Sequence, residues 1–254
     1  MGFANSDGPG PSVAVTDGAG DQGGAPLSNG TDCEEQLLVT VRDFTEMHPD
    51  FESFDGQVDG LVAFELGMDN TPTYAHAAGT SVTTGPTEFS QWYHDVAGVN
   101  MRIPGVGIDF VETSPGVFLF ESDAFFPIDG QGFGNGPLSP VPGLPIPIFE
   151  DHNYLFTTEV HTQFTYAGGE QFTFTGDDDL WIFVNRRLAI DIGGVHGSRP
   201  ETLDMDARAA ELGIELGQTY SMDIFHAERH TDGSNFRIET TIDFSCIVNI
   251  PPLE

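Results

Sequence analysis

The sequence of 254 residues contains no lysine, and all eight of its basic residues are arginines. Its 40 aspartates and glutamates give a formal net charge of −32 at pH 7. Nucleic acids and anionic membrane surfaces bind basic protein faces, so this composition argues against both as partners. It is typical of a secreted protein, of a protein from a salty environment, or of a protein that binds cations.

No run of 18 apolar residues occurs, and we therefore expect no membrane insertion. The first residues lack the basic and apolar regions of a signal peptide. Long stretches of helix-forming residues are also missing. Instead the chain holds 21 phenylalanines, 31 glycines and 17 prolines, in short strand-like segments between turn residues. This pattern predicts an all-β fold: an antiparallel β-sandwich or barrel with one or two short helices and long Gly/Pro-rich loops.

Cysteine is scarce, with only Cys33 and Cys246 in the chain. The two residues stand near the two ends of the expected folded region. A disulfide between them would tie the first strand to the last, which is typical of extracellular proteins. The alternative is a pair of unrelated buried thiols.

The chain divides by composition into three parts. Residues 1–35 are rich in Gly, Pro, Ser and Asp and cannot bury enough apolar surface to offset their ordering entropy, so we expect a disordered tail. Residues 36–248 form the expected β-sandwich domain, and residues 249–254 a short C-terminal tail.

Within the domain, two segments have helical spacing. The first starts with Thr87 as cap and ends at Gly98, and the second is "TLDMDARAAELG", which closes at Gly213. Short turns predict hairpins at Gly168–Gly169 and at Asn185–Arg186. Strand-like segments are "LLVTVRDF", residues 61–66, 103–111 and 117–122, "NYLFTTEVHTQFTYAGGEQFTFTG", "LWIFVNRRLAIDIGG", "TYSMDIFHAERH" and "NFRIETTIDFSC".

The segment "TGDDDLWIFV" places Asp177, Asp178 and Asp179 at the start of an apolar strand. Two like charges about 4 Å apart repel by about 4 kcal/mol in partly buried surroundings, so convergent carboxylates need a cation or a raised pKa. Oxygen ligands select Ca²⁺ or Mg²⁺. An EF-hand loop is excluded, because Trp181 and Ile182 stand where such a loop needs an oxygen ligand and a glycine. A calcium site, an exposed acidic turn and a pair of catalytic acids remain open.

Other residues carry weaker signals. His226, Glu228 and His230 would share one face of a strand, but their spacing is not that of a zincin, and a structural role competes with a metal site. His196, in "GGVHG", either lines a ligand pocket or packs beneath its loop. Trp181 either stacks on a sugar or belongs to the core, as do two further aromatic candidates, Trp92 and Tyr93. No nucleophile elbow occurs, and we expect no enzymatic activity.

Several segments together resemble the fibro-slime domain. They are "LLVTVRDFTEMHPDFE", "FSQWYHDVAGVN", "LFTTEVHTQFTY", "FTFTGDDDLWIFVNRRLAIDIGGVHG" and "IFHAERHTDGSNFRIETT", in this order over roughly residues 37–245. That family occurs in bacterial extracellular and slime-associated proteins and in amoebal prespore and matrix proteins. It is similar in turn to the β-sandwich of the anthrax protective antigen and of the yeast flocculins.

In the sugar-binding relatives of that family, two consecutive aspartates joined by a cis peptide hold a Ca²⁺ that contacts sugar hydroxyls. The turn "NRRLAID" assigns this pair to Asp177 and Asp178, and "RHTDGSN" assigns Asp232 and Asn235 as further metal ligands. The resemblance implies ligand contacts near this ion, for which the candidates are Asp179, Trp181, His196, Arg229 and His230.

The resulting expectation is an extracellular or cell-surface module that binds carbohydrate with Ca²⁺ as cofactor. Its partners would be a glycan or a cell-surface or matrix polysaccharide, with other matrix proteins as further partners. One alternative is a structural subunit of a matrix or surface fibre in which Ca²⁺ only rigidifies loops. The other is a hydrolase acting on polysaccharides, because paired carboxylates are possible among forty acids.

Overall fold

The computed structural model describes residues 36–136, 152–231, 233–243 and 247–252. The predictions for residues 1–35, Cys33, Asp232 and Cys246 lie outside these residues, so the disulfide and the tail stay predictions. The elements are β1 (Gln36–Asp43), β2 (Gly56–Gln57), α1 (Pro86–Phe89), β3 (Met101–Asp109), β4 (Val111–Ser114), β5 (Val117–Ser122), β6 (Phe156–Thr165), β7 (Gln171–Gly176), β8 (Asp179–Val184), β9 (Arg187–Ile192), β10 (Gly194–Val195), β11 (Arg199–Asp204), α2 (Met205–Leu212), β12 (Thr219–Glu228) and β13 (Phe236–Thr240).

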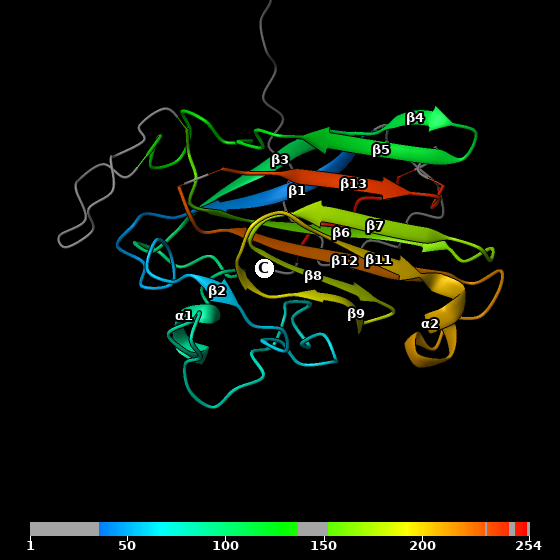
Figure 1. The fold of residues 1–254 in the computed structure, drawn as a ribbon, viewed down its shortest axis with the longest axis horizontal. Coiled ribbons are helices and arrows are strands. Elements are labelled where there is room, and N and C mark those ends of the chain that lie inside the picture. The colour runs from blue at the N-terminus through cyan, green and yellow to red at the C-terminus, as the bar shows by residue number, and fades with distance from the viewer. Residues whose placement is uncertain (1–35, 137–151, 232, 244–246, 253–254) are drawn as a thin grey trace, which may run out of the picture. The chain divides into compact units, whose positions relative to one another are not determined.

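The strands form two main antiparallel sheets (Figure 1). The six-stranded sheet has the order β3-β1-β6-β12-β8-β9, and the five-stranded sheet has the order β11-β7-β13-β5-β4. A third, two-stranded sheet joins β10 to β2. The predicted all-β antiparallel sandwich is confirmed.

Alternation along the strands builds the main core between the two sheets. On β8, Leu180, Ile182 and Val184 belong to this core, while Trp181 and Phe183 point to the opposite face of the six-stranded sheet. All six residues of β8 are buried. Since side chains of a strand alternate between two faces, the six-stranded sheet must be covered on both of them.

Residues 44–100 cover the outer face of the six-stranded sheet, and we call them the covering segment. Its aromatic residues pack on the sheet: Trp92 lies 6.2 Å from Trp181, and Tyr93 lies 5.0 Å from Phe225, between ring centroids. In Figure 1 the part of this segment that carries β2 and α1 lies against the end of the sheet formed by β8 and β9. The covering segment has little regular structure and is held by its buried side chains.

The first predicted helix is mostly wrong. Helix α1 has only four residues, and its N-cap is Gly85, which makes no side-chain cap, so Thr87 is not the cap. The chain then turns so that both Trp92 and Tyr93 enter the outer core. Tertiary burial of two large rings has overridden the helical spacing that they suggest.

The second predicted helix is confirmed as α2. The Asp204 carboxylate accepts a hydrogen bond from the Ala207 backbone N–H at 3.0 Å, a regular N-cap. Gly213 ends the helix with φ 66°, in the left-handed region where glycine carries no penalty.

Of the two predicted hairpins, one is confirmed. Strands β8 and β9 pair across the turn at Asn185 and Arg186, whose φ angles are 49° and 63°. The hairpin at Gly168–Gly169 is wrong, because β6 pairs with β1 and β12 while β7 pairs with β11 and β13. Two strands of similar pattern are joined by a short turn, yet each belongs to a different sheet.

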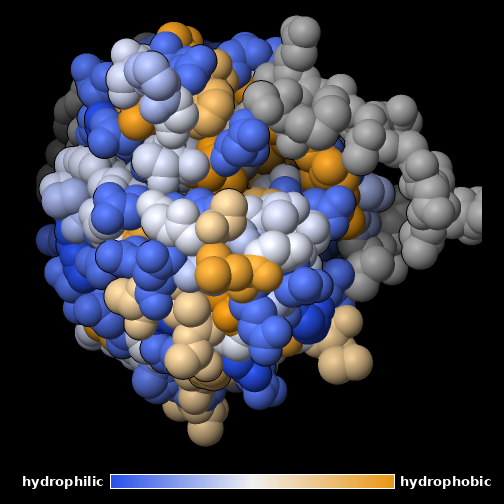
Figure 2. All heavy atoms as spheres, turned by 90° about the vertical axis from the view of Figure 1, so that its right-hand side faces the viewer, coloured by the Kyte–Doolittle hydropathy of each residue, from blue (hydrophilic) through white to orange (hydrophobic). Residues whose placement is uncertain are grey.

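Figure 2 shows the side of the domain at the right of Figure 1, where α2 lies. In the coloured part of this view, hydrophobic residues form small areas between hydrophilic ones. Leu216, which is 66% exposed and follows α2, is one of few large apolar side chains with such exposure among the described residues. None of the helices in the described part of the chain has the length and apolar character needed to span a membrane.

Candidate functional site

The three consecutive aspartates lie where the chain crosses from one sheet to the other. Residues 177–178 connect β7 to β8, and residues 229–235 connect β12 to β13. Because β7 pairs with β13 and β8 pairs with β12, these two connections lie side by side. The topology therefore brings the acidic run next to the "RHTDGSN" loop, as the resemblance implies.

Asp177 is half-buried and is bound to Asn235 by two hydrogen bonds. Its Oδ1 accepts from the Asn235 backbone N–H at 2.7 Å, and its Oδ2 accepts from the Asn235 side-chain amide at 2.8 Å. Two of the predicted metal ligands are thus in direct contact across 58 positions of sequence.

Asp178 is only 3% exposed, and its Oδ2 accepts a hydrogen bond from the Arg229 backbone N–H at 2.8 Å. Its φ angle of 59° lies in the left-handed region, which a non-glycine residue adopts at a cost of about 1 kcal/mol or more. The resemblance implies a cis bond between Asp177 and Asp178. This bond is trans, since no peptide bond among the described residues is cis.

Asp179 is fully buried and forms an internal ion pair. Its Oδ2 accepts from Arg229 Nε at 2.6 Å, and its Oδ1 accepts from the Gly194 backbone N–H at 2.6 Å. The guanidinium of Arg229 also donates to the Asp50 and Val82 carbonyl oxygens in the covering segment. Asp179 and Arg229, both predicted to contact ligand, have no exposed side-chain surface, and their polar groups are bound to each other and to the backbone.

Glu228 is the fourth acidic residue of this group. The sequence pattern linked it only to His226 and His230 and not to the three aspartates. Its side chain is buried, and its Oε2 has no hydrogen-bond partner among the described residues. Burial, and then the nearby carboxylates of Asp178 and Asp177, raise the pKa of Glu228 well above its usual range. We call Asp177, Asp178, Asp179, Glu228 and Arg229 the crossing cluster.

The charges of the crossing cluster do not balance. Burial raises the pKa of Asp178 well above its usual range; Arg229 opposes this rise, while Asp179 and Asp177 add to it. One guanidinium therefore lies among four carboxyl groups. Its positive charge is already paired with the Asp179 carboxylate in a direct ion pair. Buried like charges need further compensation by protons or by a cation.

The donor set fits a hard cation in chemistry, because carboxylate and amide oxygens are the ligands that Ca²⁺ takes. Among the described residues, however, no group of three or more His, Cys, Asp or Glu side chains is arranged to hold a metal ion. The described residues offer a pair of carboxylates, Asp177 and Asp178, with Asn235 beside them. Asp232, the fourth predicted ligand, lies outside the described residues.

The zinc hypothesis for the histidines of β12 finds no support in their surroundings. His226 is fully buried among the rings of Phe125, Phe156, Phe174 and Phe236, at centroid distances of 5.2 to 6.5 Å. Burial lowers its pKa to about 4, so the ring is neutral near pH 7. It is a core residue on the inner face of the sheet.

Trp181 and the two remaining histidines do not form one ligand surface. Trp181 is fully buried, and its indole N–H donates to Asp191 at 3.0 Å, which matches the core alternative for this residue. Its ring lies on the outer face of the six-stranded sheet, beneath the covering segment. His196 contacts the Gly197 carbonyl on the loop after β10. His230 is partly exposed, with Nε2 3.9 Å from Glu52.

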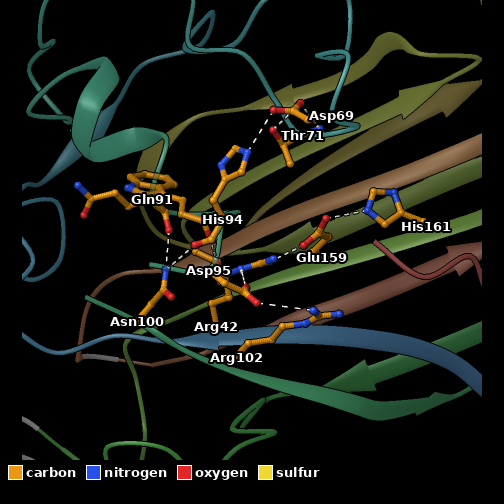
Figure 3. Close-up of polar contacts among 12 residues, drawn as sticks. Arg42, Asp69, Thr71, Gln91, His94, Asp95, Asn100, Arg102, Glu159 and His161 are labelled. Carbon is orange, nitrogen blue, oxygen red and sulfur yellow. Dashed lines mark hydrogen bonds and ion pairs between the residues drawn. The ribbon is translucent and has the colours of Figure 1, made fainter. Parts of the chain in front are cut away.

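A second buried ionic group lies on the outer face of the six-stranded sheet (Figure 3). Arg42 forms an ion pair with Glu159, whose Oε1 lies 2.7 Å from His161 Nε2. The other nitrogen of His161 lies 2.7 Å from Asp223. We call Arg42, Glu159, His161 and Asp223 the outer-face network.

Sequence reasoning missed this network, although it left a signal. In "TTEVHTQ" a glutamate and a histidine alternate with apolar or β-forming residues, which puts two ionisable groups on one face of a strand. Burial acts to lower the pKa of His161, but hydrogen bonds to Asp223 and Glu159 outweigh it and raise the pKa to about 9. The protonated ring and Arg42 together balance the two carboxylates.

Tyr93 lies between the two ionic groups. Its hydroxyl is buried without a hydrogen-bond partner among the described residues. Burial, followed by the negative charges of Asp179 and Glu159, raises its pKa well above the usual value. The charges of both ionic groups therefore affect the pKa of Tyr93, a residue of the covering segment.

Comparison with known proteins finds relatives in an amoeba, and no family model matches the chain. Protein psiD of Dictyostelium discoideum is 38% identical over 219 residues, which is 83% of this chain and 42% of psiD. Protein psiC of the same organism is 37% identical over 223 residues, with coverage of 83% and 42%. The chain spans less than half the length of these relatives, and the fibro-slime resemblance stays a prediction.

Two solved structures are similar at low identity. A PA14 sugar-binding domain from an RTX adhesin is 11% identical, with a TM-score of 0.36, 85% of this chain and 94% of that chain being covered. A PA14 domain of the antifreeze protein MpAFP is 12% identical, with a TM-score of 0.35 and coverage of 79% and 78%. TM-scores below 0.5 do not carry over a ligand or a site.

Proposed function

We propose that the domain is a calcium-dependent carbohydrate-binding module of the cell surface or extracellular matrix. The observation that carries this proposal is the excess of buried carboxyl groups in the crossing cluster, where only Arg229 supplies positive charge. A divalent cation would remove that imbalance. Asp177 and Asp178 would hold it, with the side-chain oxygen of Asn235 and with Asp232.

Calcium suits this position better than magnesium. The candidate ligands come from two irregular connections, and Ca²⁺ tolerates irregular coordination by six to eight oxygens, whereas Mg²⁺ demands a near-ideal octahedron. A bound calcium ion with free coordination positions supplies direct contacts to vicinal sugar hydroxyls. The residues of this chain hold the ion and orient it, and the fibro-slime resemblance of "FTFTGDDDLWIFV" adds support for sugar as the ligand.

A calcium site needs carboxylates that hydrogen bonds keep in place but that still have free lone pairs for the ion. Each carboxylate oxygen has two lone pairs, and the contacts to Asn235 and Arg229 use only part of this capacity. Asp179 contributes by fixing Arg229, which in turn donates its backbone N–H to Asp178. In this proposal the third aspartate positions the pair and does not bind the ion.

Thermal unfolding with calcium or chelator tests the metal. Calcium at 100 times its Kd should stabilise the wild-type domain by about 2.7 kcal/mol relative to EDTA. Asp178→Asn should stay folded, because it removes a buried charge, and should lose the response to calcium. The matched control Asp129→Asn, away from the crossing cluster, should respond like wild type. An identical unfolding temperature of the wild type in calcium and EDTA would refute the calcium site.

A glycan array run in calcium and again in EDTA tests the ligand. The proposal expects binding that disappears in EDTA and in Asp178→Asn. A calcium response without any glycan signal would instead support a structural subunit of a matrix or fibre. Release of reducing ends from a polysaccharide would support a hydrolase.

A further inference from the structure

A cavity lies on the covering segment, and no residue of the crossing cluster lines it. It has a volume of about 250 Å³ and lies between residues 69–74 and the segment 86–94 that contains α1. We call it the Asp69–His94 pocket, after the two residues at its rim. Its lining combines one carboxylate, several hydroxyls, an imidazole, two prolines and the edges of three aromatic rings: Asp69, Thr71, Pro72, Thr73, Tyr74, Pro86, Phe89, Ser90, Tyr93 and His94.

The rim of this pocket is ordered by its own hydrogen bonds (Figure 3). His94 Nε2 lies 3.1 Å from Asp69 Oδ2, and His94 Nδ1 lies 2.6 Å from the Ser90 carbonyl oxygen. Thr71 donates to Asp69 Oδ1 through its backbone N–H at 3.1 Å and its hydroxyl at 2.9 Å. Both side chains of the pair are about half exposed, at 53% for Asp69 and 45% for His94.

These bonds occupy the hydroxyl donors of Thr71 and Ser90 and leave acceptor sites, while the Tyr93 hydroxyl has no partner among the described residues. Both ring nitrogens of His94 face acceptors, and the hydroxyls of Thr71 and Ser90 donate to Asp69 and to the Thr87 carbonyl. Asp69 Oδ1 already accepts twice from Thr71 and Oδ2 contacts His94, so Oδ2 keeps one acceptor site, and the hydroxyl oxygens of Thr71 and Ser90 keep theirs. The pocket therefore calls for a ligand that brings several hydrogen-bond donors.

The apolar part of the pocket lining, called here the floor, consists of Pro72, Tyr74, Pro86 and Phe89. Such surfaces pack against C–H groups. A ligand with hydroxyls on its edge and C–H groups on its face would satisfy both the floor and the rim.

Other ligand classes fit less well. An anion brings only acceptors, and a chain of net charge −32 repels it. A purely apolar ligand would strip water from Asp69 and the hydroxyls without replacing its hydrogen bonds. An ammonium ion would pair with the Asp69 carboxylate but would find no open aromatic face, because Phe89 and Tyr93 are 1% and 2% exposed.

We propose that the Asp69–His94 pocket binds one neutral pyranose-sized sugar unit, with Asp69 Oδ2 accepting from one hydroxyl and the Thr71 and Ser90 hydroxyl oxygens from others, and that it does so without calcium. The site is separate from the crossing cluster, whose ligands and cation it does not share. A domain with two such sites would bind a polysaccharide at two points of its surface.

The test uses the full chain in EDTA, so that the calcium site cannot contribute. The probes are the methyl pyranosides of glucose, mannose and galactose, each followed by saturation-transfer NMR and by the imidazole Cε1–H resonance of His94. We expect saturation of ring protons for at least one sugar, with a Kd on the order of millimolar. We expect the His94 resonance to move with it.

The chain contains a matched control for this measurement. His152 lies 2.7 Å from Asp129 and forms a comparable partly exposed pair that does not line the Asp69–His94 pocket, so its resonance should not move. Asp69→Ala should weaken binding at least tenfold, and Asp129→Ala should leave it unchanged. Comparison of wild-type resonances keeps the test valid even where Asp69→Ala fails to fold.

Four outcomes would overturn the proposal. They are no saturation transfer from any neutral pyranoside in EDTA, an equal movement of His152 and His94, binding that is seen only with calcium, and stronger displacement of the His94 resonance by methylammonium at equal concentration. None of these results bears on the calcium response of Asp178, so failure here is distinct from failure of the proposed calcium site.

Discussion

The crossing cluster and the outer-face network are both buried and ionic, yet they differ in the balance of positive and negative groups. The network sets Arg42 and protonated His161 against Glu159 and Asp223, so that each charge has a partner. The crossing cluster sets only Arg229 against four carboxyl groups. A balanced buried network is a structural solution, whereas an unbalanced one needs compensation by protons or by a bound cation.

The difference follows from where the residues lie. The network spans neighbouring strands, and register places His161 of β6 directly opposite Asp223 of β12. Cross-strand pairing can match opposite charges in this way. The crossing cluster combines three adjacent aspartates, two in the connection before β8 and one at the start of β8, with the end of β12, so like charges meet by chain continuity.

The largest expected difference concerns the two buried arginines. Arg229→Met should destabilise the domain by about 3–5 kcal/mol in EDTA, because it leaves Asp179 buried without a counter-charge. Arg42→Met should cost less, since His161 still compensates Glu159. Urea unfolding of both variants measures this. Equal costs would show that the charge imbalance has no energetic consequence.

The next largest effect is the pH dependence of the network. The pKa of His161 is raised from 6.5 to about 9 on folding, so its contribution is complete below pH 6.5 and is lost as pH rises through about 9. The expected loss is about 3 kcal/mol. The same interaction lowers the pKa of Glu159, so the two shifts are not added.

Urea unfolding between pH 6 and 9.5 measures this loss, as the difference between wild type and His161→Gln. The half-exposed His152→Gln serves as control and should follow wild type. A stability of wild type that runs parallel to that of His161→Gln across this range would contradict the prediction.

The smallest effect is expected for two Glu→Gln substitutions, which should change the free energy of unfolding in opposite directions. Glu159→Gln should destabilise by about 2 kcal/mol, because it removes a carboxylate that both Arg42 and His161 require. Glu228→Gln should stabilise the domain in EDTA by about 1 kcal/mol, because it removes a buried carboxyl whose Oε2 lacks a partner. Calorimetry of both variants in EDTA gives the signs, and the same sign for both would break the comparison.

Much of the fold could be predicted from local pattern. The turn at Asn185–Arg186, the cap of α2 at Asp204 and its end at Gly213 depend on residues within a few positions of each other. The contact between Asp177 and Asn235 was expected only through a family resemblance, since 58 positions separate the two residues. The Asp179–Arg229 ion pair had no local signal at all, because a run of aspartates looks the same whether or not a guanidinium lies behind it.

The sequence by itself determined the all-β class, the alternation of each strand and the acidity that argues against nucleic acid as a partner. Only the tertiary structure decided which sheet β6 and β7 each join, and that Trp181 faces a covering segment instead of a ligand. The physical reason is that alternation states which residues share a face, while the identity of what covers that face depends on contacts between distant parts of the chain. The same reason separates the three aspartates: Asp177 binds Asn235, Asp178 binds the Arg229 backbone, and Asp179 binds its guanidinium.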